Sequence, residues 1–215
     1  KGIIQELKCL LKTKNIGTDS DRALLLDFQA TLETKPEKAI KLEKDALAQI
    51  ETITANNARL VSNLHANLGG LYRMNGHPDL AREHMEKSIS LLDQFNLLHI
   101  NDSIPQIANY AMFLTKQQEP ERGISELQKL SGIIKEYHSD HCLDYAKVQE
   151  TLATIYLMTA NLSHAKTHFK KAFKIYEKIW ADEPEMIEAK YQEIQELYPQ
   201  IGFCIGKNLS GLLTK

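Results

Sequence analysis

The sequence predicts an all-α protein, built as a right-handed superhelical solenoid of antiparallel helix pairs. Three observations favour this class. Gly and Pro, the residues that favour turns, number only 10 and 6 among 215 residues, which leaves room for few but long elements. Apolar residues recur at the spacing of one helix face, and one pattern repeats every 42 residues. Stacked helix pairs cannot bury a core alone, so each is expected to pack on the next.

The repeat occurs in four copies that share one register. A segment beginning at His65 recurs 84 residues later at Gln149. A shift of 42 residues from His65 gives two further copies, one beginning at Ile107 and one, in the other direction, at Ala23. In each copy a small residue lies early in the second helix, where it lets two helices approach closely. A large residue in the first helix fills the space between them. The small residues are Ala39, Ala81, Gly123 and Ala165, and the large ones are Leu26, Leu68, Tyr110 and Leu152.

Signals for helix ends mark the turns between the helices. Thr34 and Pro36 are predicted to open one second helix, as its N-cap residue and an early helical proline. Gly76 and Pro78 bracket the next such turn, and Pro120 serves a third. Each copy is therefore predicted to form a helix, a short turn and a second helix.

The flanks of the four copies are less regular. Residues 3–14 are predicted to form the second helix of a preceding repeat, residues 186–197 a further first helix, and residues 200–213 a capping helix or a stub of the next unit. Because the chain opens on Lys1 without Met, we expect a fragment of a longer protein. The predicted divisions are 1–18 for the end of a preceding repeat or an N-terminal cap, 19–60, 61–102, 103–144 and 145–187 for repeats 1 to 4, and 188–215 for a C-terminal half repeat or capping helix.

The shared positions resemble the tetratricopeptide repeat, whose pattern is Trp, two residues, Leu-Gly, two residues and Tyr, followed by Ala, three residues and Phe. Copies two and four match it best, and the Trp position holds His65, Ile107 and Gln149. The period of 42, where the commonest form of the family has about 34 residues, resembles the kinesin-light-chain-like subclass. Residues 139–147 resemble the linker of that subclass, although Cys142 stands where the linker has Pro.

First helices line the concave surface in this family, so the resemblance implies a peptide-binding groove there. Asn67 and Asn109 are equivalent positions, and each amide can donate to and accept from the backbone of an extended peptide. Methionines are deformable apolar contacts, and basic side chains can meet an acidic side chain or a terminal carboxylate. The alternative is that these are solvated helix-surface residues. The predicted groove consists of Asn63, Asn67, Arg73, Met74, Asn109, Met112, Lys116, Lys147, Thr151 and Met158.

Composition excludes several classes of partner and location. A net charge of −2 offers no electrostatic footprint for nucleic acid, so direct binding to DNA or RNA is not expected. The sequence lacks the long uncharged apolar run that a membrane span needs. Its three cysteines, at distant positions, argue against a disulfide framework. We therefore expect a protein of the reducing cytoplasm, without a membrane partner.

Catalytic and metal-binding motifs are not found in the sequence. His138, His141 and Cys142 are close in sequence but do not match a zinc signature. No glycine-rich phosphate loop occurs, and Gly69-Gly70 is attributed to close helix packing. We therefore expect neither an enzyme, a cofactor nor a metal.

Two function classes remain. The first is a protein–protein interaction module that binds a linear peptide or a partner helix in the concave groove. The second is the sensory or regulatory domain of a larger protein, such as a bacterial transcription regulator or a peptide-responsive signalling protein. Both use the groove, and both imply a protein or peptide partner. Further domains of the same polypeptide are also candidate partners.

Overall fold

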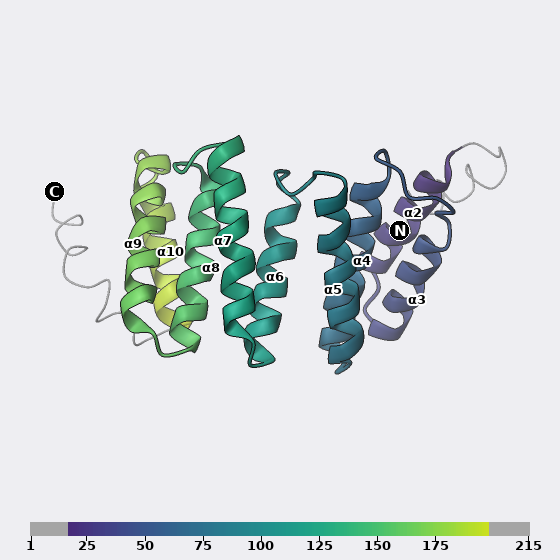
Figure 1. Ribbon diagram of the computed structural model, residues 1–215, viewed down its shortest axis with the longest axis horizontal. Helices are drawn as coiled ribbons and strands as arrows, with labels where there is room; N and C mark the ends of the chain where they lie inside the picture. Colours follow the sequence, from purple (N-terminus) through teal and green to yellow (C-terminus); the bar gives the residue numbers. More distant parts are fainter. Residues whose placement is uncertain (1–16, 198–215) are drawn as a thin grey trace. The chain divides into compact units, whose positions relative to one another are not determined.

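The computed structural model describes residues 17–197, and within this range the chain consists of α-helices joined by turns, without a strand (Figure 1). The helices predicted over residues 3–14 and 200–213 lie outside the described residues. The described helices are α2 (Asp19–Thr31), α3 (Pro36–Leu47), α4 (Ala58–Met74), α5 (Pro78–Gln94), α6 (Ser103–Lys116), α7 (Pro120–Tyr137), α8 (Leu143–Met158), α9 (Leu162–Ile179) and α10 (Pro184–Leu197).

The chain divides into two compact units, the first ending at Gln106 and the second beginning at Ile107. In unit 1, α2 packs along α3 and α4 along α5, and α3 also contacts α4. In unit 2, α8 packs along α9, while α7 contacts α8 and α10 contacts α9. Helix α6 begins in unit 1 and continues into unit 2. The described helices thus follow the predicted order of alternating first and second helices.

A hydrophobic core lies between the helices of each unit. In unit 1, Leu64 of α4 is fully buried, and the partly buried Leu26 of α2 packs against the same cluster. In unit 2, the aromatic ring of Phe173 stacks on that of Tyr191, with 3.9 Å between ring centroids. Because Tyr191 and the buried Ile194 belong to α10, this helix covers an apolar face of α9. The helix predicted over residues 186–197 is confirmed, and it begins two residues earlier, at Pro184.

The small residues of the repeat lie where the two helices of a pair come closest. Ala39, Ala81 and Ala165 are at most 2% exposed. A Cβ atom on Gly123 of α7 would lie 2.7 Å from the backbone oxygen of Ala111 in α6, closer than Cβ atoms tolerate. The register inferred from the sequence therefore places a small residue where a larger one cannot fit.

The pair Gly69-Gly70 divides between two different environments. A Cβ atom on Gly69 would lie 2.6 Å from Cγ of Met85, so this glycine permits the contact between α4 and α5. A Cβ atom on Gly70 would meet nothing within 4 Å. The attribution of Gly70 to close packing is therefore wrong, because this residue points away from the partner helix.

Prolines open the second helices as predicted, but one cap differs. Pro36, Pro78 and Pro120 are each the first residue of their helix. The N-cap of α3 is Lys35 rather than Thr34, and no side chain caps this helix. The carboxylate of Glu33 accepts hydrogen bonds from the backbone N–H groups of Thr34 and Lys35, at 3.0 and 3.1 Å. This carboxylate holds the turn together, so a threonine hydroxyl is not needed there.

Polar bridges replace the Trp of the repeat pattern in copies two and four. Nδ1 of His65 lies 2.9 Å from Nδ1 of His84, and 84 residues later Nδ1 of His168 donates to Oε1 of Gln149 at 2.8 Å. Burial lowers the pKa of His65 and of His168 to about 4, so both rings are neutral near pH 7. In copy three, the equivalent Ile107 is buried as an apolar residue. One position between the paired helices is thus filled in two chemically different ways.

Two glycines of α7 provide a matched test of this packing. We expect Gly123→Ala to lower the unfolding free energy of unit 2 by about 1–3 kcal/mol, because the added methyl group collides with the backbone of α6. The measurement is chemical denaturation followed by circular dichroism.

Gly132→Ala is the control, since a Cβ atom at Gly132 meets nothing within 4 Å. Alanine is the better helix former, so this variant should be more stable than the wild type by about 0.5–1 kcal/mol. Equal effects of the two substitutions would show that Gly123 is not at a close helix contact.

Candidate functional site

The predicted groove residues lie on three first helices. Those on α4 belong to unit 1, and those on α6 and α8 belong to unit 2. On α4, Arg73 is exposed and Met74 is 72% exposed. Asn63 and Asn67, on the same helix, are only partly exposed. The four residues of unit 1 therefore differ in how much of their side chain a ligand can reach.

The side chain of Asn63 is held inside unit 1 by hydrogen bonds. Its Nδ2 donates to Oδ2 of Asp102 at 3.3 Å, and its Oδ1 accepts from Nε2 of Gln106 at 2.6 Å. Asp102 also pairs with Arg59 at 2.6 Å, and Oε1 of Gln106 accepts from the hydroxyl of Ser62 at 2.9 Å. These bonds connect α4 to the start of α6, so the Asn63 amide serves a structural purpose.

Asn67 is engaged with two acidic side chains from the preceding helix pair. Its Nδ2 donates to Oδ1 of Asp27 at 2.9 Å and to Oε1 of Glu43 at 3.2 Å. Glu43 is 1% exposed, and its Oε2 has no hydrogen-bond partner among the described residues. Burial, with the neighbouring Asp27 carboxylate, raises the pKa of Glu43 to about 8. The Glu43 carboxyl is therefore mainly protonated at neutral pH, which removes the charge repulsion from Asp27.

The repeat register contains a signal for this acidic pair that the groove prediction did not use. Glu43 stands at the position that Met85, Leu127 and Phe169 fill in the other copies. Asp27 stands at the position of Gly69, which touches Met85. Copy one therefore replaces a contact between a small and a large residue by a contact between two carboxyl groups, and Asn67 bridges them.

The groove residues of unit 2 are more accessible. Asn109, Lys116 and Lys147 are exposed, and Met158 is 42% exposed. Lys147 lies 3.5 Å from Asp144, one turn before it. The exposed set thus offers an amide, two cations and a thioether from α6 and α8.

Two further predicted residues of unit 2 are partly buried. Met112 is half-buried on α6. The hydroxyl of Thr151 donates to the backbone oxygen of Lys147 at 2.9 Å, so it is used within its own helix. These two side chains are therefore less available to a ligand than the other four.

A partly buried polar cluster connects α8 to the helices that follow it. The hydroxyl of Tyr176 donates to Oε2 of Glu150 at 2.6 Å, and Lys190 of α10 lies 2.9 Å from Oε1 of the same carboxylate. Burial of Lys190 by itself lowers the pKa of this amine, but the bonds to Glu150 and Glu193 outweigh it and raise the pKa. The exposed residues of α8 are therefore presented by a helix anchored on its buried side.

Metal and membrane sites are not evident in the described part of the chain. Over residues 17–197, the His, Cys, Asp and Glu side chains form no group of three or more that could hold a metal ion. None of the helices in this range has the length and apolar character required to cross a membrane.

A family model described as Tetratricopeptide repeat matches residues 103–178. Over this range the chain consists of tetratricopeptide repeats. Its helix pairs have the same fold as solved structures of kinesin-light-chain-like proteins. At the level of its fold it is a protein–protein interaction module. No curated protein matches the sequence significantly.

Solved structures with the same fold come from several sources. A putative kinesin light chain from Podosopora anserina, with nearly identical TPR-like repeats, is 15% identical with a TM-score of 0.67, covering 84% of this chain and 90% of that one. BtubC (BKLC) from P. vanneervenii is 18% identical with a TM-score of 0.66, covering 81% and 70%. A Rap protein complexed with Competence and Sporulation Factor is 14% identical with a TM-score of 0.58, covering 92% and 57%.

The acidic pair of unit 1 should make stability depend on pH. The raised pKa of Glu43 means that the folded state keeps a proton that the unfolded chain releases above about pH 4.5. The contribution of Glu43 should therefore lower the unfolding free energy by about 2–4 kcal/mol as the pH rises from about 5 to about 8. Glu43→Gln keeps an uncharged side chain at every pH and should abolish this loss. Denaturant titrations of unit 1 at both pH values measure it.

The control for this titration is Glu37→Gln, on the exposed face of the same helix. The unfolding free energy of the Glu37→Gln variant should change between the two pH values by as much as that of the wild type. This variant keeps Glu43 and the partly buried histidines, so their contributions cancel in the comparison. A Glu43→Gln variant with the wild-type pH profile would mean that Glu43 does not hold the extra proton.

Proposed function

We propose that this chain binds an extended segment of a partner protein along the exposed residues of α6 and α8 in unit 2. The observation that carries the proposal is the state of Asn109. Its amide is exposed and makes no side-chain hydrogen bond to the described residues. Asn63 and Asn67 instead spend their amide groups on neighbouring helices. Asn109 therefore keeps both a donor and an acceptor for the backbone of a bound segment.

The neighbouring side chains define what the segment should contain. Lys116 and Lys147 are exposed cations that favour acidic side chains or a terminal carboxylate. The thioether of Met158, which is 42% exposed, favours an apolar side chain. We therefore propose a segment with both acidic and apolar residues, and a binding role without catalysis.

The helices behind these residues support a rigid surface. Tyr176 and Lys190 hold the buried side of α8 through Glu150, and the contact between Gly123 and Ala111 holds α6 against α7. A rigid surface loses little conformational freedom on binding, so weak polar contacts contribute more of their free energy to affinity.

The test is isothermal titration with a peptide selected by phage display against the wild-type chain. Asn109→Ala should weaken binding by about 0.5–1.5 kcal/mol, with little dependence on salt, because it removes hydrogen bonds to neutral groups. Lys116→Ala and Lys147→Ala should weaken binding of an acidic peptide, and this loss should shrink as salt rises, because ions screen exposed charges.

Matched controls come from second helices. Gln128 of α7 is an exposed amide and Lys166 of α9 an exposed amine, and changing either to Ala should leave the affinity unchanged. Circular dichroism checks that all variants are folded. Affinities that respond to the controls but not to Asn109, Lys116 or Lys147 would place the binding surface elsewhere and refute the proposal.

A further inference from the structure

A second surface of unit 2 shows an unusual concentration of positive charge. Helix α9 carries five lysines and one glutamate, although the whole chain has a net charge of −2. All five lysines are exposed. Since the positive charge is gathered on one helix of a slightly acidic protein, this helix is a candidate for contact with an anion.

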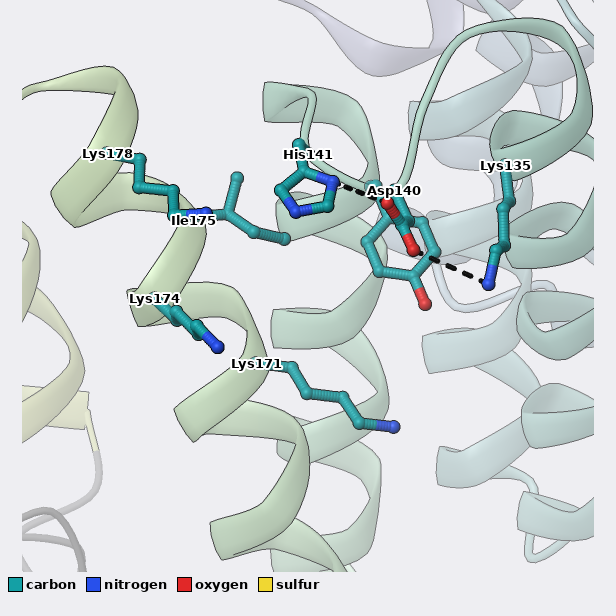
Figure 2. Close-up of a pocket in the computed structure, with 8 residues that line it drawn as sticks. Lys135, Asp140, His141, Lys171, Lys174, Ile175 and Lys178 are labelled. Carbon is teal, nitrogen blue, oxygen red and sulfur yellow. Dashed lines mark ion pairs between the residues drawn. The ribbon is translucent and has the colours of Figure 1, made fainter.

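Three of these lysines line a pocket of about 320 Å³. Lys171, Lys174 and Lys178 recur at the spacing of one helix face, and they span about 10 Å along the helix axis at 1.5 Å per residue. Figure 2 shows their side chains beside the space between α9 and the segment that carries Asp140 and His141. The pocket therefore has a row of cations along one wall.

The opposite wall is largely neutralised. One carboxylate oxygen of Asp140 forms an ion pair with Lys135 of α7 at 3.4 Å, and the other lies 2.5 Å from Nδ1 of His141 (Figure 2). The pocket lining thus sets four lysines against a single aspartate. In the described part of the chain, no carboxylate forms an ion pair with the three lysines of α9.

The remaining lining is apolar in character. Ile175, on α9 between the lysines, is 6% exposed, and Tyr145, in the first turns of α8, is half-buried. An isoleucine and a tyrosine ring beneath a row of lysines suit a chain that alternates acidic residues with an apolar one. Neighbouring same-side residues of an extended segment are about 7 Å apart, and successive lysines of this row are about 4.5 and 6 Å apart along the helix axis. The long lysine side chains can cover this difference and reach successive carboxylates.

We infer that this pocket binds an acidic segment of a partner protein, with carboxylates at Lys171, Lys174 and Lys178 and an apolar side chain over Ile175 and Tyr145. None of the lining residues belongs to the groove proposed above, so the two surfaces are independent. Nucleic acid suits the pocket less well, because a duplex needs a broad basic face and the whole chain is slightly acidic.

The probe is a fluorescein-labelled peptide of about ten residues, with Glu at alternate positions and one central Leu, spaced as an extended chain requires. Anisotropy titration at about 50 mM salt should detect binding that weakens as salt rises. The same peptide with Gln in place of Glu should not bind. Absence of binding by the Glu peptide, or equal binding by the Gln peptide, would overturn the inference.

Two double variants of one helix remove equal charge at different places. Lys174→Gln with Lys178→Gln should weaken the Glu peptide about five- to tenfold, because both cations line the pocket. Lys166→Gln with Lys170→Gln, exposed but outside the lining, should weaken it less than about twofold. Equal losses in the two variants would mean diffuse attraction to α9 and refute the pocket.

Two further titrations distinguish the pocket from the α6 and α8 surface and from a nucleic-acid site. Because the α6 and α8 surface is also proposed to bind an acidic segment, Asn109→Ala and Lys116→Ala are titrated with the same Glu peptide, and the pocket inference requires the Lys174 and Lys178 variant to lose more affinity than either of them. If Asn109→Ala and Lys116→Ala weaken binding of the Glu peptide while the Lys174 and Lys178 variant does not, the peptide occupies the α6 and α8 surface. That result would refute the pocket inference and support the proposed function. Tighter binding of a labelled single-stranded oligonucleotide than of the Glu peptide would assign the lysines to nucleic acid instead and overturn the inference.

Discussion

The close approach of the two helices within a pair is the contact on which the rest of the structure depends. Gly123 brings α7 against the backbone of α6, and Gly69 brings α4 against Met85 of α5. The distance between paired helices determines which residues are covered and which face solvent. The exposed side of α6, with Asn109, is therefore a consequence of a glycine on the helix behind it.

Two different positions between paired helices tolerate very different chemistry, provided that both contacting residues change together. Asp27 and Glu43 replace the contact of Gly69 with Met85, and Asn67 bridges the two carboxyl groups. His65 with His84, and Gln149 with His168, replace an aromatic residue. Buried polar groups are stable only when paired, so each polar residue in the core requires a partner from another helix. These pairs withdraw side chains from the surface available to partners.

Charge is distributed unevenly between the described faces of unit 2. First helices α6 and α8 expose an amide, two lysines and a methionine, whereas second helix α9 exposes five lysines. A net charge near zero conceals this separation, because acidic residues elsewhere in the chain offset the lysines. For a repeat protein, the charge of each helix face predicts its partners better than the total does.

The sequence by itself determined the period of 42, the helix order, the prolines that open second helices and the need for small residues at Ala81 and Gly123, because all of these follow from spacing along one chain. Only the tertiary structure decided that Asn67 is tied to Glu43, that Gly70 faces away from its neighbour and that Lys174 lines a pocket with Asp140. Periodicity identifies the helix face on which a residue lies. The partner that meets a side chain comes from another helix, and its distance and burial depend on how the helices pack.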